Sequence, residues 1–339
     1  MSLLKQDGFD YYTAALGFVN GGKWDAAGGA IAGMISGAYG GQAVAITAGS
    51  MQKNLSNLVE GYCGFRWSCN GLVNAATIMW AIYDGATSQV DLRSDTTGHL
   101  YFTRGGTVLG TAVDPYTYPN LWQSYQIHWL IDNSNGLLEL RREGVTVLSV
   151  TGADTQVSAN AYGTLFWLGK SGNNMNWNFD DVWVVDTADS PVGTRCKTWL
   201  GDARATLHSP SATGSSQQWT PSAGTNISCV DDTTPNDNTD YVYSANVGDL
   251  DLYKHSGLPA SAKTVFNVRQ IGRAYKDEAG ARGVQLAMKS GTTTDLSSEI
   301  ALGASYLNYN RNNELDPNTG NPWSVSAAND LEYGHKVSS

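Results

Sequence analysis

Residues 121–132 read LWQSYQIHWLID, and this stretch decides the fold class. Its large apolar side chains share one phase of a two-residue repeat: Leu121, Tyr125, Ile127, Trp129 and Ile131. Its polar side chains take the other phase: Ser124, Gln126, His128 and Asp132. A period of two places the two sets on opposite faces of one strand, so the segment is predicted to be a half-buried β-strand.

The same pattern continues along the neighbouring sequence. The turn sequence NSNG (133–136) leads into LLELRRE (137–143), and Gly144 leads into VTVLSV (145–150). Short alternating segments separated by turn residues are typical of an antiparallel meander. Further strands are predicted at 42–47, 76–84, 89–95, 99–106, 107–113, 161–169 and 179–186. Their spacing of about ten residues is typical of a β-sandwich.

The composition fits an all-β chain of two domains. The 339 residues are too many for one ordinary hydrophobic core. Charged residues make up only 15%, too few for long surface helices, and the many Gly and aromatic residues suit strands and tight turns. After residue 188 the sequence becomes rich in Gly, Ser, Thr and Pro. We therefore predict two tandem jelly-roll-like β-sandwich domains, at 1–188 and 227–339, joined by a linker or extended arm at 189–226.

Charge and hydropathy argue against two classes of partner. The formal net charge is −10, so a general nucleic-acid-binding surface is not expected. The uncharged stretch 28–49 contains seven glycines, whereas a membrane-spanning helix needs about 20 predominantly apolar residues. We predict two strands joined at SGAYGGQ (36–42) there, and no insertion into a membrane.

The four cysteines leave the question of disulfides open. They include no C-x-x-C pair, so a zinc site is not expected. Cys63 and Cys69 flank GFRWS, and a bridge between them would require the chain to fold back. The sequence alone does not say whether Cys63–Cys69 or Cys196–Cys229 is bridged.

The order of several motifs resembles known families. YQIHWLID, LLELRREGVTVLSVTGADT, GTLFWLGKSG and the closing FDDVWVVD (179–186) together resemble laminin-G-like, concanavalin-A-like jelly-roll domains. DGFDYY, WLGDARATLHSPSATGSSQQWTP, DYVYSANVGDLDLY, RAYKDEAGARGVQL and LDPNTGNPWS occur in an order similar to that of tailed-bacteriophage virion structural proteins. The resemblance covers most of the chain. It implies a laminin-G/concanavalin-A-like first sandwich in a component of a phage particle.

Catalytic carboxylates are the first chemistry to consider, because concanavalin-like sandwiches include glucanases. The glucanase strand Glu-x-Asp-x-x-Glu is absent, and Glu139 and Glu143 lie beside two arginines, as on an exposed charge-paired face. The sequence contains neither Gly-x-Ser-x-Gly nor His-Glu-x-x-His, and His128 falls on the polar face of its strand. We therefore predict no catalytic residue, no cofactor and no enzymatic activity.

Two loops are weak candidates for ligand binding. The loop at 230–240 offers four carboxylates to a cation such as Ca²⁺: Asp231, Asp232, Asp237 and Asp240. Such residues also close turns through Asx hydrogen bonds, so no metal is predicted. The loop DPYTYPNLW (114–122) carries three aromatic rings: Tyr116, Tyr118 and Trp122. These rings would pack in the core or in an interface, or they would stack on a carbohydrate or receptor.

The acidic stretch NFDDVWVVD (178–186) is interpreted as the closing strand of the first domain. On an unbroken strand, one face would carry Asp180, Val182 and Val184. The other face would carry Phe179, Asp181, Trp183 and Val185. The two neighbouring aspartates would then not bind one metal ion together, and hydrogen bonds to nearby turns are expected instead.

Composition and resemblance together predict a function. Low charge and many aromatic residues are typical of obligate interfaces. We predict a non-enzymatic structural protein of a bacteriophage virion, surface-exposed or tail-associated, that contacts other virion proteins and forms a homo-oligomer. Two alternatives stay open: a head (capsid) decoration protein, and a lectin-like adhesin that binds host-surface carbohydrate.

Overall fold

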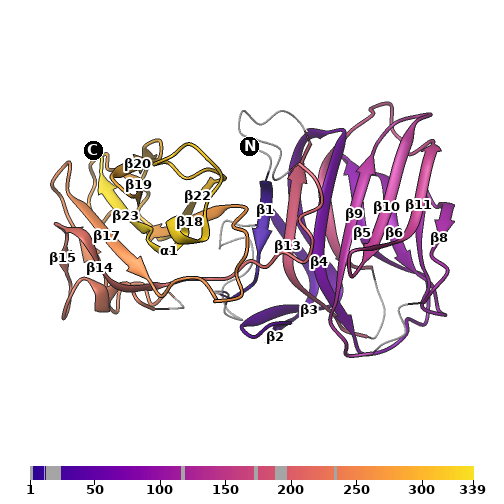
Figure 1. The fold of residues 1–339 in the computed structure, drawn as a ribbon, viewed down its shortest axis with the longest axis horizontal. Helices are drawn as coiled ribbons and strands as arrows, with labels where there is room; N and C mark the ends of the chain where they lie inside the picture. Colours follow the sequence, from indigo (N-terminus) through magenta and orange to yellow (C-terminus); the bar gives the residue numbers. More distant parts are fainter. Residues whose placement is uncertain are drawn as a thin grey trace. The chain divides into compact units, whose positions relative to one another are not determined.

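The chain divides into two compact units. The computed structural model describes residues 3–10, 12, 24–115, 119–171, 175–187, 197–232 and 235–339 (Figure 1). The described residues up to Thr206 form unit 1, and those from Leu207 onward form unit 2. Nearly all of the regular secondary structure in both units is β-strand, which confirms the predicted all-β sandwich class. The helices described here, η1 (Ile227–Cys229) and α1 (Val325–Asn329), are each far too short to cross a membrane.

The strands described in unit 1 join in one hydrogen-bonded sheet that folds into two layers (Figure 1). The front layer contains β1 (Leu3–Asp7), β4 (Glu60–Cys69), β9 (Gln123–Leu130), β10 (Gly136–Arg142), β11 (Val145–Ala153) and β13 (Trp177–Asp186). The back layer contains β2 (Ala26–Ser36), β3 (Gln42–Leu58), β5 (Thr77–Asp84), β6 (Thr87–Ser94), β7 (Leu100–Arg104), β8 (Thr107–Thr111) and β12 (Gly163–Lys170). The strand order is β11-β10-β9-β4-β13-β3-β12-β5-β6-β7-β8, with β1 beside β13 and β2 beside β3.

The alternation in β9 places its apolar side chains between the two layers, as predicted. Tyr125, Ile127, Trp129 and Ile131 are completely buried. Trp129 packs on Trp80 of β5 in the opposite layer, with ring centroids 5.6 Å apart. The prediction was wrong for Leu121, which is 53% exposed because it precedes β9 and is not held to the strand alternation.

The closing strand β13 contains a bulge that the sequence pattern did not predict. Its register against β4 shifts between Asp180 and Trp183, and Asp181 has a left-handed backbone with φ 50°. Phe179 therefore faces the core, where it contacts Phe65 with ring centroids 5.7 Å apart. The unbroken alternation predicted for this stretch is thus wrong, because Phe179 lies on the same face as the fully buried Val182.

The first strand is held in place by a buried polar group. Asp7 and Lys5 are both buried, with Lys5 Nζ 3.6 Å from Asp7 Oδ2. Asp7 Oδ2 also accepts hydrogen bonds from Tyr12 Oη and Trp24 Nε1, each 2.8 Å long, and Asp7 Oδ1 accepts one from the Phe9 amide. A buried carboxylate is tolerated only with such partners, so they stabilise the N-terminal strand against β13.

The described cysteines are free thiols. Cys63 and Cys69 both point into the core from β4, six residues apart on one extended strand. That spacing separates them by roughly 20 Å, so they are not bridged. The third, Cys229, donates to the Ala223 carbonyl in unit 2. Cys196 lies outside the described residues.

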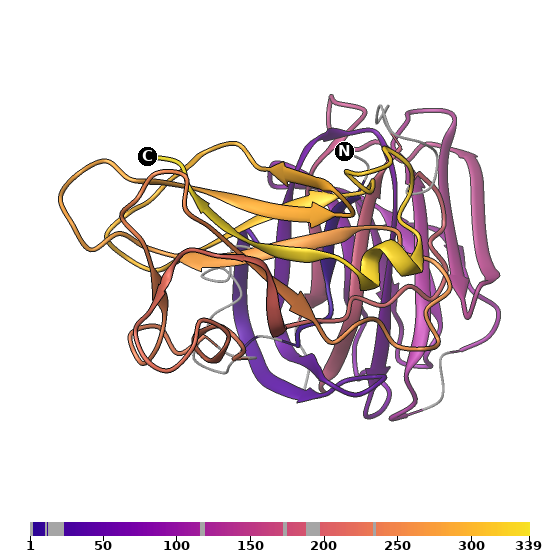
Figure 2. The ribbon, with the colours of Figure 1, turned by 60° about the vertical axis from the view of Figure 1, so that its left-hand side comes forward.

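Unit 2 is built around a six-stranded antiparallel sheet. Its path is β14 (Pro210–Gln217), β17 (Leu250–His255), β23 (Glu332–Val337), β19 (Gly283–Ser290) and β20 (Thr293–Leu296), with β21 (Ile300–Ala301) beside β19. Two ribbons accompany it: β15 (Thr220–Pro221) with β16 (Val242–Tyr243), and β18 (Val268–Ala274) with β22 (Leu307–Asn313). Figure 2 shows α1 leading into β23. The predicted arm 189–226 is divided between the units, since residues 197–206 belong to unit 1 and β14 belongs to unit 2.

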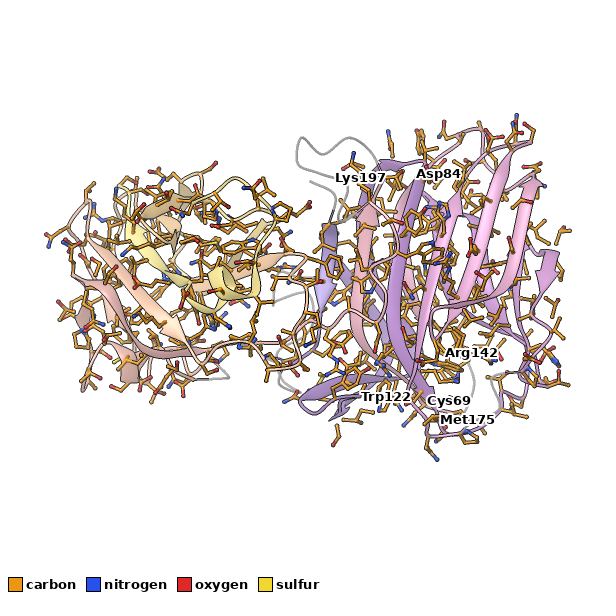
Figure 3. The ribbon with its side chains drawn as sticks, in the orientation of Figure 1. Cys69, Asp84, Trp122, Arg142, Met175 and Lys197 are labelled. Carbon is orange, nitrogen blue, oxygen red and sulfur yellow. The ribbon has the colours of Figure 1, made fainter. Side chains whose placement is uncertain are left out.

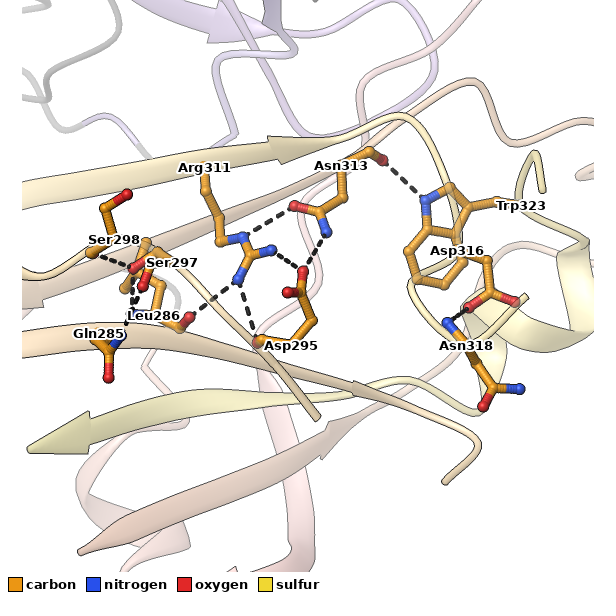
Figure 4. Close-up of polar contacts among 10 residues, drawn as sticks. All are labelled: Gln285, Leu286, Asp295, Ser297, Ser298, Arg311, Asn313, Asp316, Asn318 and Trp323. Carbon is orange, nitrogen blue, oxygen red and sulfur yellow. Dashed lines mark hydrogen bonds and ion pairs between the residues drawn. The ribbon is translucent and has the colours of Figure 1, made fainter. Parts of the chain in front are cut away.

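Arg311 connects the β18–β22 ribbon to the main sheet of unit 2 (Figure 4). Its guanidinium pairs with the Asp295 carboxylate and donates to the carbonyls of Leu286 and Asp295 at 3.1 and 3.2 Å. It also donates to Asn313 Oδ1, while the Asn313 carbonyl accepts from Trp323 Nε1 at 2.8 Å. Trp323 in turn packs against Met288 in the core of unit 2.

The buried position of Ile127 predicts the effect of a charge there. Ile127→Asp should lower the free energy of unfolding of unit 1 by several kcal/mol, a large part of a typical total of about 5–15 kcal/mol, because the carboxylate would have no partner. Val145→Asp is the matched control, since Val145 is 66% exposed. Urea unfolding measures both changes, and equal stability of the two variants would contradict the assigned phase of β9.

Candidate functional site

The outer face of the front layer, which points away from the core, carries its polar side chains in register. Tyr62, His128 and Glu139 are direct partners across β4, β9 and β10. Two residues further along the strands, Gln126 is the partner of Arg141. This arrangement follows from the two-residue period, which sends the alternate positions of three adjacent strands to the same face.

Six side chains on this face form what we call the outer-face cluster: Glu60, Tyr62, His128, Glu139, Arg141 and Trp199. The His128 and Tyr62 rings are stacked with centroids 3.9 Å apart, and His128 Nε2 is 2.7 Å from Glu60 Oε1. Glu139 Oε1 accepts from Arg141 Nε at 2.8 Å and from Thr146 Oγ1 at 2.6 Å. The cluster therefore combines aromatic rings, two carboxylates and a cation.

Trp199 reaches the cluster from a segment that we call the strap (197–206). Its ring lies 4.0 Å from the Arg141 guanidinium and packs edge-on against Tyr62 at 4.9 Å. The Gly201 amide donates to Gln126 Oε1 at 3.0 Å, which explains why this glutamine is buried on a polar face. The strap thus lies along the outer face of the front layer and supplies part of the site.

The protonation states in the cluster follow from burial and from neighbouring charges. Burial lowers the pKa of His128, and this effect outweighs the Glu60 carboxylate, which would raise it. Burial also raises the pKa of Tyr62, and the charges of Glu60 and Glu139 add to this. For Glu139, burial alone would raise the pKa, but hydrogen bonds from Thr146 and Arg141 lower it. At neutral pH the cluster therefore offers a neutral imidazole at His128, a phenol at Tyr62 and an ionised carboxylate at Glu139.

A second polar group lies at the bulge of β13. Asp180 Oδ2 accepts from the Ala38 amide at 2.8 Å, and Asp181 Oδ1 accepts from the Ala205 amide of the strap at 2.9 Å. Burial raises the pKa of Asp180 to about 8, with the Asp181 charge adding to the effect. Burial raises the pKa of Asp181 to about 6. Both carboxylates bind backbone amides of other segments, as the sequence interpretation expected of this stretch.

The aromatic loop predicted as a contact site is only partly described. Tyr116 and Tyr118 lie outside the described residues. Trp122 is half-buried, and Figure 3 shows it toward the same end of unit 1 as Cys69 and Met175. It lies six positions from His128, roughly 20 Å along the strand direction, so the described structure does not bring it into the outer-face cluster.

The acidic loop of unit 2 is held by amide and guanidinium groups. Asn236 Nδ2 donates to Asp232 and to Asp240, each at 2.6 Å. Asp237 receives two hydrogen bonds from Arg273, at 2.5 and 2.7 Å. Asp231 is exposed. Within the described ranges, no three His, Cys, Asp or Glu side chains are grouped to hold a metal ion.

Sequence reasoning found part of the outer-face cluster. The alternation correctly placed His128 on the polar face of β9, and Glu139 was expected beside Arg141. Tyr62 and Trp199 were missed. Tyr62 carries a usable signal, since it alternates with the apolar Cys63 and Phe65 in β4. Trp199 carries none, because only the tertiary path of the strap brings it to this face.

Comparison with known proteins gives similarity in fold. No protein-family model matches the chain, and no curated protein matches it in sequence. The alginate lyase Aly36B is similar over 55% of this chain and 96% of its own, with 12% identity and a TM-score of 0.37. A carbohydrate esterase of the Shiga toxin-encoding bacteriophage phi24B is similar over 55% and 98%, with 18% identity and a TM-score of 0.38. Domain 4 of the arabinanase AbnA from Geobacillus stearothermophilus, in complex with arabinotriose, is similar over 58% and 97%, with 14% identity and a TM-score of 0.40.

These comparisons correct one prediction. The sequence led us to expect a protein without enzymatic activity, partly because the glucanase motif is absent. That expectation is wrong as stated, because an alginate lyase and a carbohydrate esterase are among the structures that this chain resembles. A missing motif of one enzyme family says nothing about the other chemistries that a jelly-roll sandwich carries.

The buried aspartates at the bulge predict that unit 1 becomes less stable as the pH rises. In the unfolded chain Asp180 has its ordinary pKa of 3.8, whereas in the folded protein its pKa is about 8. Between about pH 4 and pH 8 the folded state therefore holds a proton that the unfolded chain has released, and the free energy of unfolding falls as the pH rises. Asp180→Asn should flatten this dependence, so that its gain in stability over the wild type grows across that interval and reaches the order of several kcal/mol near its upper end. Tryptophan fluorescence during urea unfolding measures this, because nine of the eleven tryptophans precede residue 207.

The exposed Asp114 provides the matched control for this substitution. Asp114→Asn should keep the wild-type slope of stability with pH. An Asp180→Asn variant with that same slope would show that Asp180 is ionised in the folded protein and would overturn the assignment.

Proposed function

We propose that the protein recognises carbohydrate through the outer-face cluster, as a component of a bacteriophage virion that meets the host surface. The observation that supports this most strongly is the composition of the cluster. Trp199 and Tyr62 bring aromatic rings to a face where Arg141, Glu139 and Glu60 provide charged hydrogen-bonding groups. A sugar ring combines an apolar C–H face with a rim of hydroxyls, and such a mixture of groups suits it.

The state of the polar groups favours a ligand with many hydroxyls. The neutral imidazole of His128 can donate and accept, while the two carboxylates only accept and Arg141 only donates. The Glu60 side chain is 37% exposed, and that of Arg141 is 29% exposed, so both remain open to a ligand. His128 holds Glu60, and the Trp199 ring lies against Arg141, so the directions of both side chains are fixed before binding, which lowers the entropic cost of binding.

The proposal that the protein belongs to a virion is supported by its sequence. The order of motifs similar to phage virion proteins supports it, together with the low share of charged residues. In this proposal the chain forms a homo-oligomer and contacts other virion proteins, as symmetric particle positions require. A tail or surface position would bring the cluster to host polysaccharide. A position as head decoration protein is the alternative.

Cleavage of the bound carbohydrate is a second candidate function. His128 is neutral at pH 7, and it stacks on the protonated Tyr62 while its Nε2 lies 2.7 Å from Glu60. A neutral imidazole beside a phenol could accept and deliver a proton during cleavage of a glycosidic link. In this case Arg141 would neutralise an acidic group of the substrate.

Substitutions in the cluster separate these possibilities. Trp199→Ala and Arg141→Ala should each weaken binding of the purified protein to host-envelope polysaccharide by about tenfold to a hundredfold, as loss of 1–3 kcal/mol of contacts implies. Arg104→Ala in the back layer is the control, because Arg104 also pairs with one carboxylate, Asp154, at 2.7 Å. If only Trp122→Ala reduced binding, the loop 114–122 would be the site instead. Cleavage would be established if the wild-type protein released soluble saccharide and the His128→Ala variant still bound the polysaccharide but released none.

The virion assignment predicts that the protein is part of washed particles. Quantitative mass spectrometry of particles purified through two density gradients should find it at a copy number that is a multiple of a particle symmetry. The major capsid protein serves as the internal reference for the count. Loss of the carbohydrate-binding protein itself from the particles during high-salt washing would contradict a structural position, even if its carbohydrate binding were real.

A further inference from the structure

Four tyrosines gather at one end of the β18–β22 ribbon in unit 2. Tyr275 directly follows β18 and Tyr306 directly precedes β22, and their ring centroids are 4.2 Å apart. Tyr241 and Tyr243, at the β16 strand, form a second ring pair at 6.1 Å. Tyr241 is close enough to Tyr306 to affect its ionisation. We call these four residues the tyrosine patch.

The tyrosine patch is held by a polar frame. Asp237 binds the Arg273 guanidinium through both carboxylate oxygens, and this guanidinium lies 5.3 Å from the centre of the Tyr306 ring. The Tyr306 hydroxyl donates to Asn238 Oδ1 at 3.2 Å, and Arg273 Nη1 donates to Asn308 Oδ1 at 3.4 Å. The loop that carries Asp237 and Asn238 and the β18–β22 ribbon therefore hold each other in place, and the rings are positioned before any ligand binds.

The rings of the tyrosine patch are open to solvent to different degrees. Tyr243 is 52% exposed and Tyr241 is 38% exposed, whereas Tyr275 and Tyr306 are half-buried. Burial first, and then Tyr275, raise the pKa of Tyr306 to about 12, so its hydroxyl stays protonated and can donate. An exposed pair beside a more buried pair offers both flat apolar surface and fixed hydroxyls.

The charges around the tyrosine patch indicate which ligand it suits. Arg273 and Asp237 neutralise each other through a bidentate pair, so the frame offers an acidic or basic ligand no free charge from these two groups. Beside this ion pair the tyrosine patch offers phenol rings, phenol hydroxyls and the amide groups of Asn238 and Asn308. Such groups bind uncharged molecules that have hydroxyls and an apolar face. Nucleic acid is disfavoured by the net charge of −10.

We propose that the tyrosine patch is a second carbohydrate-binding site, for a neutral oligosaccharide. It is separate in sequence from the outer-face cluster, which belongs to unit 1, and it differs in chemistry. The outer-face cluster surrounds its rings with an arginine, two carboxylates and a histidine, so a glycan bound there would meet charged groups. The tyrosine patch, with its charges paired, suits an uncharged one. This inference does not depend on the function proposed for unit 1.

A panel of neutral and acidic oligosaccharides tests the proposal with the full-length protein. Neutral members should bind, and titration calorimetry on the best of them should show that Tyr243→Ala and Tyr306→Ala each weaken affinity about tenfold, as loss of an aromatic contact implies. Leu307→Ala is the matched control, because Leu307 is 50% exposed beside Tyr306 but outside the tyrosine patch.

Three outcomes would overturn the proposal. The first is that no neutral oligosaccharide of the panel binds. The second is binding that survives in both tyrosine variants while their circular dichroism spectra match the wild type, which would place the ligand elsewhere. The third is a dimer in sedimentation that Tyr243→Ala dissociates, since the tyrosine patch would then be an interface between copies of the chain.

Discussion

The bulge at Asp181 in β13 is the constraint on which most of unit 1 depends. β13 pairs with β4 along most of its length, and its other neighbour changes from β3 to β1 across the bulge. On a regular strand, Phe179 and Val182 would point to opposite faces, and one of them would leave the core. The left-handed backbone at Asp181 lets both be buried, and aspartate is among the residues that adopt this conformation at modest cost.

The same bulge connects the core to the surface that we propose binds carbohydrate. Asp181 accepts the amide of Ala205 and so fixes one end of the strap, while Gly201 is bound to Gln126 nearer its middle. Trp199 reaches Tyr62 and Arg141 only because the strap is held along this path. The geometry of the outer-face cluster is therefore determined partly by a backbone irregularity in a neighbouring strand.

The sequence predicted what depends on local period, and it failed where tertiary contacts decide. The phase of residues 125–131 followed from side-chain alternation alone, since each strand position has only two possible directions. The strands on either side of SGAYGGQ were predicted for a different reason, since the uncharged stretch around it is too rich in glycine for a membrane-spanning helix. The predicted face of Phe179 was wrong, because the bulge at Asp181 shifts the alternation of side chains along β13 and leaves no periodic signal in the sequence. The strap was predicted to be part of a linker, because it has few apolar residues and these pack on a sheet that is distant in sequence. Trp199 and the tyrosine patch could not be grouped with their partners for that reason.

Burial of the thiols on β4 has a consequence for where this fold can form. Burial raises the pKa of Cys63 well above the usual thiol range and that of Cys69 to about 11, so neither supplies the thiolate that reacts with oxidants or exchanges disulfides. Among its described cysteines, unit 1 has no cross-link to form by oxidation or to lose to a reductant. These two cysteines therefore impose no redox step on folding, in the reducing interior of a cell or in an oxidising medium outside it.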